Sequence, residues 1–309
     1  MIAFIFPGQG AQKVGMGKGL CDAFPEARAA FDEADAAFGD SLSRLCFEGP
    51  EDRLTLTENT QPAILAMSTA ACRVLVSRGI EPAFVAGHSL GEYSANVAAG
   101  TFGFADAIAT VRRRGRYMQE AVPVGSGAMA AILGLDVARV QQACDEAAEG
   151  DVVSPANING PGQVVIAGTT AAVQRASERA RALGAKRAIP LAVSAPFHCA
   201  LMKPAEERLA PELRALRVQD PRVPVVANVD SDPKRTASAA IEALVRQVSA
   251  PVQWEEVVRR LASEGVTTYV EVGPGRVLSG LVQKIHKDAQ VYSFGAPDDL
   301  APIEAALRA

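Results

Sequence analysis

Short apolar runs alternate along this chain with longer segments of helical periodicity. Ile2–Phe6 and Ala83–Ala86 have the length and character of buried strands. The segment before the second run carries apolar residues on every side, as expected of a buried helix. We expect Pro62 to lie in the first turn of this helix and Gly79 to end it. Strands that alternate with helices in this way predict an α/β fold with a parallel sheet.

A different pattern occupies residues 127–192. Apolar strands and two helical segments follow one another there in the order β-α-β-β-α-β. This order is typical of the split β–α–β, or ferredoxin-like, unit. We therefore predict a large α/β domain formed by residues 1–126 and 193–309, into which residues 127–192 are inserted as a small subdomain. A cleft is expected where the two units meet.

The strand-to-helix turn at residues 87–91, called the elbow below, carries the first candidate catalytic residue. Its sequence, G-H-S-L-G, fits the pattern G-x-S-x-G, in which a serine lies on a sharp turn that exposes its oxygen. Gly87 and Gly91 would lie where backbone passes close to backbone and a Cβ would clash. The following helix would direct N–H groups toward Ser89. The alternative is a serine in an ordinary β–α turn.

The chain has three histidines, His88, His198 and His286. His198 follows the predicted return to the large domain, and it is the candidate base for Ser89. His88 is a poor candidate because its side chain should point away from that of its neighbour Ser89. His286 lies in a basic segment and is expected at the surface. None has the spacing of a zinc ligand to another His or Cys, so we predict no metal site.

Three consecutive arginines, Arg112–Arg114, lie on a helix predicted to begin at Phe104. Successive helical side chains point about 100° apart, so the three cannot all face solvent. One should point inward, where a guanidinium requires an anion. The pattern alone leaves open which of the three it is.

A glycine-rich loop, Pro7–Gln12, follows the first strand. The dinucleotide-binding pattern fails because Lys13 stands where a third glycine is needed. A P-loop fails because Gly17 and Lys18 are followed by Gly19 rather than Ser or Thr. The loop is either a tight turn whose N–H groups face a site or an ordinary glycine-rich turn.

Composition narrows the functional classes. Of the 309 residues, 49% are hydrophobic and 21% are charged, which is typical of a soluble globular protein. A net charge of −4 argues against nucleic acid as the main partner. No apolar run is long enough for a membrane helix, and no secretory signal is visible. Five cysteines without a C-x-x-C pair suit reduced thiols, so we expect a cytoplasmic protein.

Six motifs occur together in the order of one known family. They are Phe6–Gln12, Gly87–Tyr93, Arg114-Gly115, Ala195–Cys199, Pro251–Trp254 and Glu271–Gly275. On these motifs the chain resembles the malonyl-CoA:acyl carrier protein transacylases, the stand-alone acyltransferases of fatty acid synthesis. The resemblance covers essentially the whole chain, and it implies an α/β-hydrolase-like large domain.

The resemblance implies a ping-pong reaction without a cofactor. Ser89 would attack the thioester of malonyl-CoA, coenzyme A would leave, and the phosphopantetheine thiol of acyl carrier protein would take the malonyl group. It also implies a monomer whose partners are malonyl-CoA and the carrier protein, with no nucleic acid or membrane involved.

The resemblance also implies roles for individual residues. His198 would be the base, oriented by the backbone carbonyl of Gln247 rather than by an acid. The backbone N–H groups of Gln9 and Leu90 would form the oxyanion hole. Arg114 would be the inward arginine and would bind the malonyl carboxylate through its guanidinium fork.

Two further residues are expected beside the substrate, His88 and Phe197. Phe197 departs from other stand-alone members, which can carry a small polar residue there. This departure bears on substrate size and not on the reaction.

Three alternatives remain open. A trans-acting acyltransferase of a polyketide synthase would use the same fold and chemistry. A serine hydrolase or thioesterase would share the elbow but would have an acid for its histidine and no arginine for a carboxylate. A non-catalytic scaffold would have lost Ser89 or His198, and both are present.

Acyl carrier proteins are acidic, so a local basic patch is expected to dock the partner. The candidates are Lys186-Arg187, at the end of the small subdomain, and Lys284–Lys287. Both could equally be solvated faces with no partner.

Overall fold

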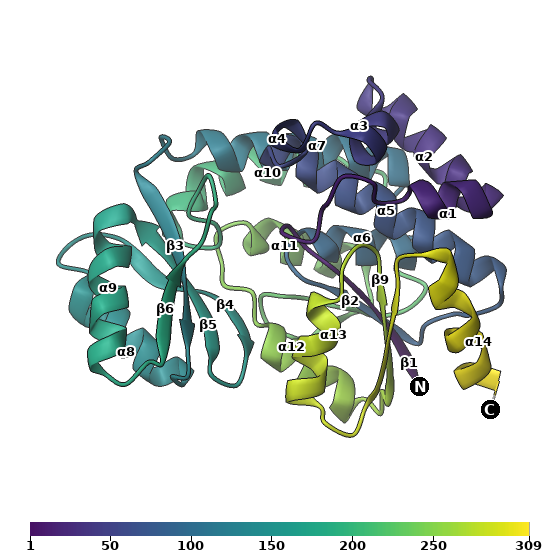
Figure 1. Ribbon diagram of the computed structural model, residues 1–309. Coiled ribbons are helices and arrows are strands. Elements are labelled where there is room, and N and C mark those ends of the chain that lie inside the picture. The colour runs from purple at the N-terminus through teal and green to yellow at the C-terminus, as the bar shows by residue number, and fades with distance from the viewer. Residues whose placement is uncertain (309) are drawn as a thin grey trace.

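The computed structural model describes residues 1–308, which form two β-sheets surrounded by helices (Figure 1). The larger sheet has six strands in the order β10-β9-β1-β2-β7-β8. These strands are β1 (Ile2–Phe6), β2 (Phe84–Gly87), β7 (Val225–Val226), β8 (Pro233–Lys234), β9 (Thr268–Val272) and β10 (Gln290–Phe294). The α/β prediction is confirmed. The sheet is mixed rather than wholly parallel, because the edge strand β8 returns antiparallel to β7 after a short connection.

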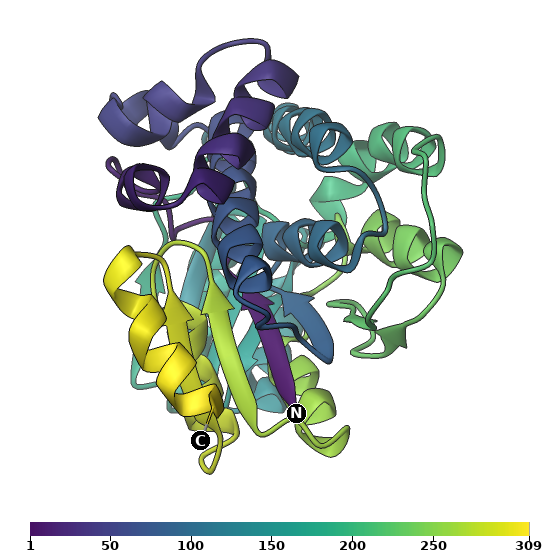
Figure 2. The same ribbon diagram turned by 90° about the vertical axis from the view of Figure 1, so that its right-hand side faces the viewer.

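Helices lie on both faces of this sheet (Figure 2). The helices of the described residues, including two that pack on a second sheet, follow here in chain order. They are α1 (Lys18–Ala23), α2 (Pro25–Phe38), α3 (Leu42–Glu48), α4 (Glu51–Leu54), α5 (Thr57–Ser77), α6 (Leu90–Ala99), α7 (Phe104–Glu120), α8 (Val137–Ala147), α9 (Thr170–Ala182), α10 (Lys203–Arg214), α11 (Ala237–Gln247), α12 (Trp254–Ser263), α13 (Val277–Ile285) and α14 (Leu300–Arg308), with 3₁₀ turns at Ala200–Met202 and Pro297–Asp299.

Strand β1 shows how the sequence divides the core. Its side chains alternate between the two faces of the sheet. Phe4 and Phe6 pack into the larger cluster with residues of α2, α5, α6 and α7, whereas Ala3 and Ile5 pack with residues of α12 and α13. The sheet is therefore buried on both faces, and its functional groups must lie at the ends of strands.

Helix α5 corrects one expectation, because Pro62 lies inside the helix and not in its first turn. The helix begins earlier, at Thr57, because two side chains hold the segment before the proline. Asn59 Nδ2 donates to the carbonyl of Arg53 at 2.9 Å, and Thr60 Oγ1 donates to that of Leu54 at 2.6 Å. The C-terminal expectation is confirmed, since the helix ends at Ser77 just before Gly79.

The second sheet has four antiparallel strands in the order β4-β5-β3-β6. They are β3 (Gly127–Leu133), β4 (Val153–Gly160), β5 (Gln163–Thr169) and β6 (Arg187–Pro190). Helices α8 and α9 pack on one face of this sheet around a core of their own (Figure 1). Strand β4 approaches the larger unit through a parallel bridge between Asn157 and Val252. A seam between the two sheets therefore runs along β4.

Two further observations concern the chain as a whole. The five cysteines are all free and buried. Among the described residues, no helix is both long and apolar enough to cross a membrane.

Candidate active site

Ser89 lies between the end of β2 and the start of α6, with φ 51° and ψ −105°. A Cβ on Gly87 would lie 2.0 Å from the carbonyl carbon of Gly91, and one on Gly91 would lie 2.0 Å from the carbonyl oxygen of Phe6. The expected close approach of backbone at both glycines is confirmed. The positive φ of Ser89 is uncommon for a residue other than glycine, and the serine borders a cavity.

His198 is the residue paired with this serine. Its Nε2 lies 2.6 Å from Ser89 Oγ, and its Nδ1 lies 3.0 Å from the backbone carbonyl of Gln247 at the end of α11. A carbonyl can only accept, so Nδ1 carries the proton and Nε2 is free to accept from the serine hydroxyl. The imidazole is buried and has no carboxylate partner among the described residues.

The electrostatic setting keeps this imidazole neutral. Burial lowers the pKa of His198 to about 3, and the positive charge of Arg114 adds to the effect. A neutral imidazole is the form that can accept a proton from Ser89.

Arg114 is the arginine that points inward. It is 1% exposed, whereas Arg112 donates to the carbonyl of Phe38 and Arg113 pairs with Glu212. The guanidinium of Arg114 donates to three oxygens: Gln61 Oε1 at 2.9 Å, Gln247 Oε1 at 2.9 Å and Ser89 Oγ at 3.2 Å. It forms no ion pair with any described carboxylate, and its Nε has no partner. A buried cation without a counter-ion is a receptor for an anion.

These groups border one cavity of about 130 Å³. The predicted residues that line it are Gln9, His88, Ser89, Leu90, Arg114, Phe197 and His198. The other lining residues are mostly apolar: Gln61, Met118, Met129, Asn157, Val165, Leu191 and Val193. Gln247 lies behind Arg114 and His198 and does not line the cavity. A larger hollow of about 680 Å³ lies beyond α6, at Ser94 and Val97, and holds none of the predicted residues.

Gln9 and Leu90 are the two residues whose backbone N–H groups were expected to form an oxyanion hole. Leu90 is the first residue of α6, so its N–H has no acceptor within the helix. The side chain of Gln9 turns away, donating from Nε2 to Thr57 Oγ1 at 3.3 Å. Both residues border the cavity.

The other two histidines have structural partners. His88 borders the cavity, but its Nε2 lies 2.8 Å from Asn159 Oδ1 and its ring contacts Trp254, so it does not reach Ser89 as a base. His286, which was predicted at the surface, is only partly exposed. Its ring is half-buried edge-on against Tyr269, whose hydroxyl lies 3.1 Å from Nδ1.

Two residues that support the site were missed from the sequence. Asn228, which follows β7, accepts from the N–H of Ser89 at 2.8 Å and donates to the carbonyl of Gly87 at 2.7 Å. Glu92, in the first turn of α6, accepts from the backbone N–H of Asn228 at 3.0 Å. A polar residue at the end of the strand beside the elbow was the available signal for Asn228.

No group of three or more His, Cys, Asp or Glu residues within residues 1–308 could hold a metal ion. The reactive groups at this cavity are a serine, a neutral histidine and a buried guanidinium. Together they suit transfer of an acyl group that carries an anion.

The chain belongs to the acyl transferase domain family, whose model matches residues 3–296. Its similarity to characterised members is high and extends over nearly its full length. It is 52% identical to a malonyl CoA-acyl carrier protein transacylase of Escherichia coli K12, over 97% of both chains. It is 51% identical to the protein of that name from Bacillus subtilis, over 97% of this chain and 95% of that protein.

A solved structure adds a partner to this comparison. It shows a malonyl-transacylase in complex with its acyl-carrier protein from a type II polyketide synthase. That transacylase is 48% identical to this chain over 97% of both, with a TM-score of 0.95.

Proposed function

We propose that this chain transfers the malonyl group of malonyl-CoA to the phosphopantetheine thiol of an acyl carrier protein, through a malonyl ester on Ser89. The observation that carries the proposal is the contact of Ser89 Oγ with both His198 Nε2 and the guanidinium of Arg114. One contact activates the nucleophile, and the other brings a carboxylate receptor beside it. The names of the relatives support the same substrates.

In the first half-reaction, His198 Nε2 takes the proton of Ser89 as Oγ attacks the thioester carbonyl. The N–H groups of Gln9 and Leu90 donate to the oxyanion. The tetrahedral intermediate then collapses, the C–S bond breaks, and the imidazolium returns its proton to the leaving coenzyme A thiolate. The Gln247 carbonyl holds Nδ1–H throughout, so the ring keeps its tautomer.

The second half-reaction runs the same steps in reverse. His198 takes the proton of the carrier thiol, whose sulfur attacks the malonyl ester, and Ser89 leaves and regains a proton. Only the chain's own residues and the two thiol carriers take part, so the proposal includes no cofactor.

The proposal extends to architecture and setting. Residues 1–126 and 193–309 would form an α/β-hydrolase-like domain, and residues 127–192 would form a ferredoxin-like subdomain. The β-α-β-β-α-β order and the antiparallel sheet of the smaller unit support that view. We further propose that the enzyme acts as a monomer in the cytoplasm and supplies fatty acid synthesis. The carrier complex of a relative favours a polyketide pathway as the second candidate.

Intact mass spectrometry tests the reaction. Mixing with malonyl-CoA should add one malonyl group, which Ser89→Ala should lack and which carrier protein should remove. An adduct that persists in Ser89→Ala would refute the assignment. Free malonate formed as fast without carrier as with it would identify a hydrolase instead. The absence of an adduct on the wild type would favour the third alternative, a non-catalytic scaffold.

Carrier docking would use one of two exposed basic pairs, Lys186 with Arg187 or Lys284 with Lys287, none of which forms an ion pair among the described residues. Reversing the charge of the docking pair should raise the KM for carrier and leave acylation of Ser89 by malonyl-CoA unchanged. Arg53→Glu, at an exposed site on α4, is the control. If neither pair affects this KM, both docking assignments are wrong.

A further inference from the structure

Glu92 is a buried carboxylate that has no role in the proposed reaction. It lies three residues after Ser89 on the first turn of α6 and is 1% exposed. Among the described residues, none of the ion pairs includes Glu92. Burying a carboxylate without a cation is costly, so its acceptor oxygens should serve a purpose that an apolar residue could not.

The contacts of Glu92 lead directly to the site. Its Oε2 accepts from Gln247 Nε2 at 2.8 Å and from the backbone N–H of Asn228 at 3.0 Å. Asn228 in turn accepts from the N–H of Ser89. The amide of Gln247 also donates to the carbonyl of Ser89 at 2.9 Å. Two residues that touch the elbow are therefore held by one carboxylate.

The carboxylate and the guanidinium of Arg114 together fix which way the Gln247 amide faces. An ionised carboxylate only accepts, so the NH₂ end of the amide must point toward Glu92. The oxygen end then points toward Arg114, whose Nη2 donates to it at 2.9 Å. In the flipped orientation, NH₂ would face the guanidinium, which only donates. The same residue holds His198 through its backbone carbonyl.

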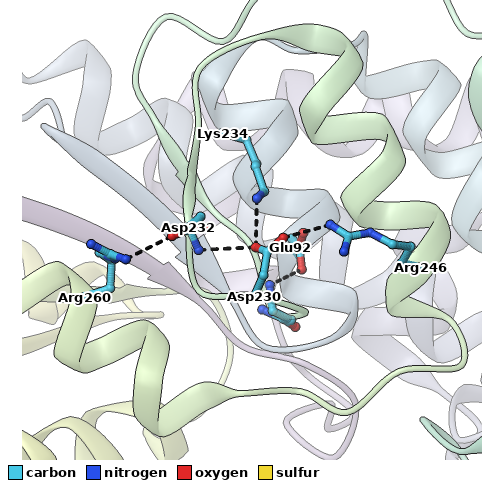
Figure 3. Close-up of polar contacts among 7 residues, drawn as sticks. Glu92, Asp230, Asp232, Lys234, Arg246 and Arg260 are labelled. Carbon is cyan, nitrogen blue, oxygen red and sulfur yellow. Dashed lines mark hydrogen bonds and ion pairs between the residues drawn. The ribbon is translucent and has the colours of Figure 1, made fainter.

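The charges around Glu92 come from several elements. Burial raises its pKa to about 7, and nearby Asp230 adds to this, whereas the Asn228 and Gln247 hydrogen bonds and the charge of Arg114 oppose it. Figure 3 shows Glu92 with the neighbouring charged cluster, in which Asp230 is itself paired with Lys234 and Arg246, each at 2.8 Å. Those two cations are thus engaged by another acid.

We propose that Glu92 is a positioning residue, which orients the Gln247 amide and thereby fixes Arg114 for a carboxylate-bearing acyl group. This inference rests on the proposed function. Its first test is the ratio of kcat/KM for malonyl-CoA to that for acetyl-CoA. Glu92→Ala should lower this ratio about tenfold, the effect of one hydrogen bond to a charged group. Glu92→Gln should stay within about threefold of the wild type, because its carbonyl oxygen can accept both bonds.

Glu271 provides a matched control. It is also a buried glutamate with backbone N–H donors, accepting from Leu278 at 3.1 Å and Ser279 at 2.7 Å, but it serves α13 instead of α6. Glu271→Ala should lower the melting temperature and leave the malonyl to acetyl ratio unchanged. If Glu92→Ala lowers both rates in parallel, as a loss of folded protein would, the inference is overturned.

Two measurements remain if Glu92→Ala does not fold. The wild-type ratio should change by no more than about threefold as pH drops below about 7 and Glu92 gains a proton, because a protonated carboxyl keeps a carbonyl oxygen that accepts both bonds, as in Glu92→Gln. A tenfold fall in the wild type alone would show that the negative charge, rather than the acceptor oxygen, is required, and it overturns the inference. The second readout needs no catalysis: the Gln247 side-chain NH₂ signal should be protected from hydrogen exchange in the wild type and in Glu92→Gln. An unprotected signal overturns the inference even if transfer is normal, whereas a missing Ser89 adduct refutes only the proposed function.

Discussion

Nη2 of Arg114 lies 3.2 Å from Oγ of Ser89, so the cation and the nucleophile of the site are in direct contact. An acyl group bound to this oxygen starts beside the guanidinium. A malonyl group carries its carboxylate one methylene beyond the ester carbonyl, so this carboxylate can reach the guanidinium of Arg114. An acetyl group offers no such anion.

Arg114→Ala should therefore lower malonyl transfer far more than acetyl transfer. Each hydrogen bond to a charged group contributes about 1.5–3 kcal/mol, so two lost bonds predict a fall of at least a hundredfold in kcat/KM for malonyl-CoA. Arg114→Lys should recover little, since an ammonium lacks the planar fork. Arg113→Ala, on the outward face of α7, is the control. Parallel losses for both substrates would show that Arg114 is structural.

His198 should remain neutral well below the pH at which a solvated histidine takes up a proton. Its pKa is lowered to about 3, first by burial and then by Arg114, so between pH 5 and 8 the imidazole should not titrate. Histidine NMR should show the Nδ1–H tautomer across that range. Arg114→Ala should raise this pKa by removing a neighbouring positive charge. Titration near pH 6.5 in the wild type would contradict the role of the buried base.

Phe197 should help to exclude an α-methyl group from the cavity that it lines. One methylene in an apolar pocket is worth about 1–3 kcal/mol, or roughly 10–200-fold in discrimination. Phe197→Ser should raise kcat/KM for methylmalonyl-CoA relative to malonyl-CoA within that range. Met118→Leu, a change of similar volume at another wall of the cavity, should leave the ratio nearly unchanged. An unaltered ratio in Phe197→Ser would mean that its ring does not border the acyl carbon.

Gly91→Ala should disrupt the elbow, because the added Cβ would lie 2.0 Å from a backbone oxygen that cannot move alone. Overpacking of this kind costs about 1–3 kcal/mol or more, and it should lower both the melting temperature and the yield of acylated Ser89. Gly280→Ala on α13 is the matched control, since a Cβ added there would meet no atom within 4 Å apart from its chain neighbours and the backbone of its own helix. That helical substitution should be neutral or stabilising by up to about 1 kcal/mol. An active and stable Gly91→Ala variant would show that the backbone around the elbow can shift to make room for the added Cβ.

The elbow could be predicted because its geometry is local. Gly87 packs against the backbone of Gly91 within the same five residues, and only the contact of Gly91 with the carbonyl of Phe6 comes from another strand. The inward direction of one arginine also followed from helical periodicity, although only the family resemblance singled out Arg114 among the three. Local patterns therefore identified the candidate nucleophile and limited the candidate cation to one of three consecutive arginines.

The support of the elbow could not be predicted in this way, because it comes from distant parts of the chain. Gln247 and Asn228 contact Ser89 across 158 and 139 residues. Gln247 has no local pattern that distinguishes it from any other amide, and Asn228 is marked only by its position at the end of a strand. The prediction that Pro62 lies in the first turn of its helix failed because the side-chain hydrogen bonds of Asn59 and Thr60 outweighed the preference of proline for that position.

The walls of the acyl cavity come from two separate sheets. Met129, Asn157 and Val165 lie on β3, β4 and β5 of the four-stranded sheet, whereas Ser89 and Arg114 lie on α-helical and turn segments that pack on the six-stranded sheet. Met129 and Val165 pack into the larger hydrophobic cluster, whereas α8 and α9 cover the other face of their sheet with a core of its own. Part of the acyl cavity can therefore change through residues 127–192, provided that Met129 and Val165 still pack on the larger unit. A chimera that exchanges this segment between relatives would inherit a new acyl range while keeping the chemistry of its parent.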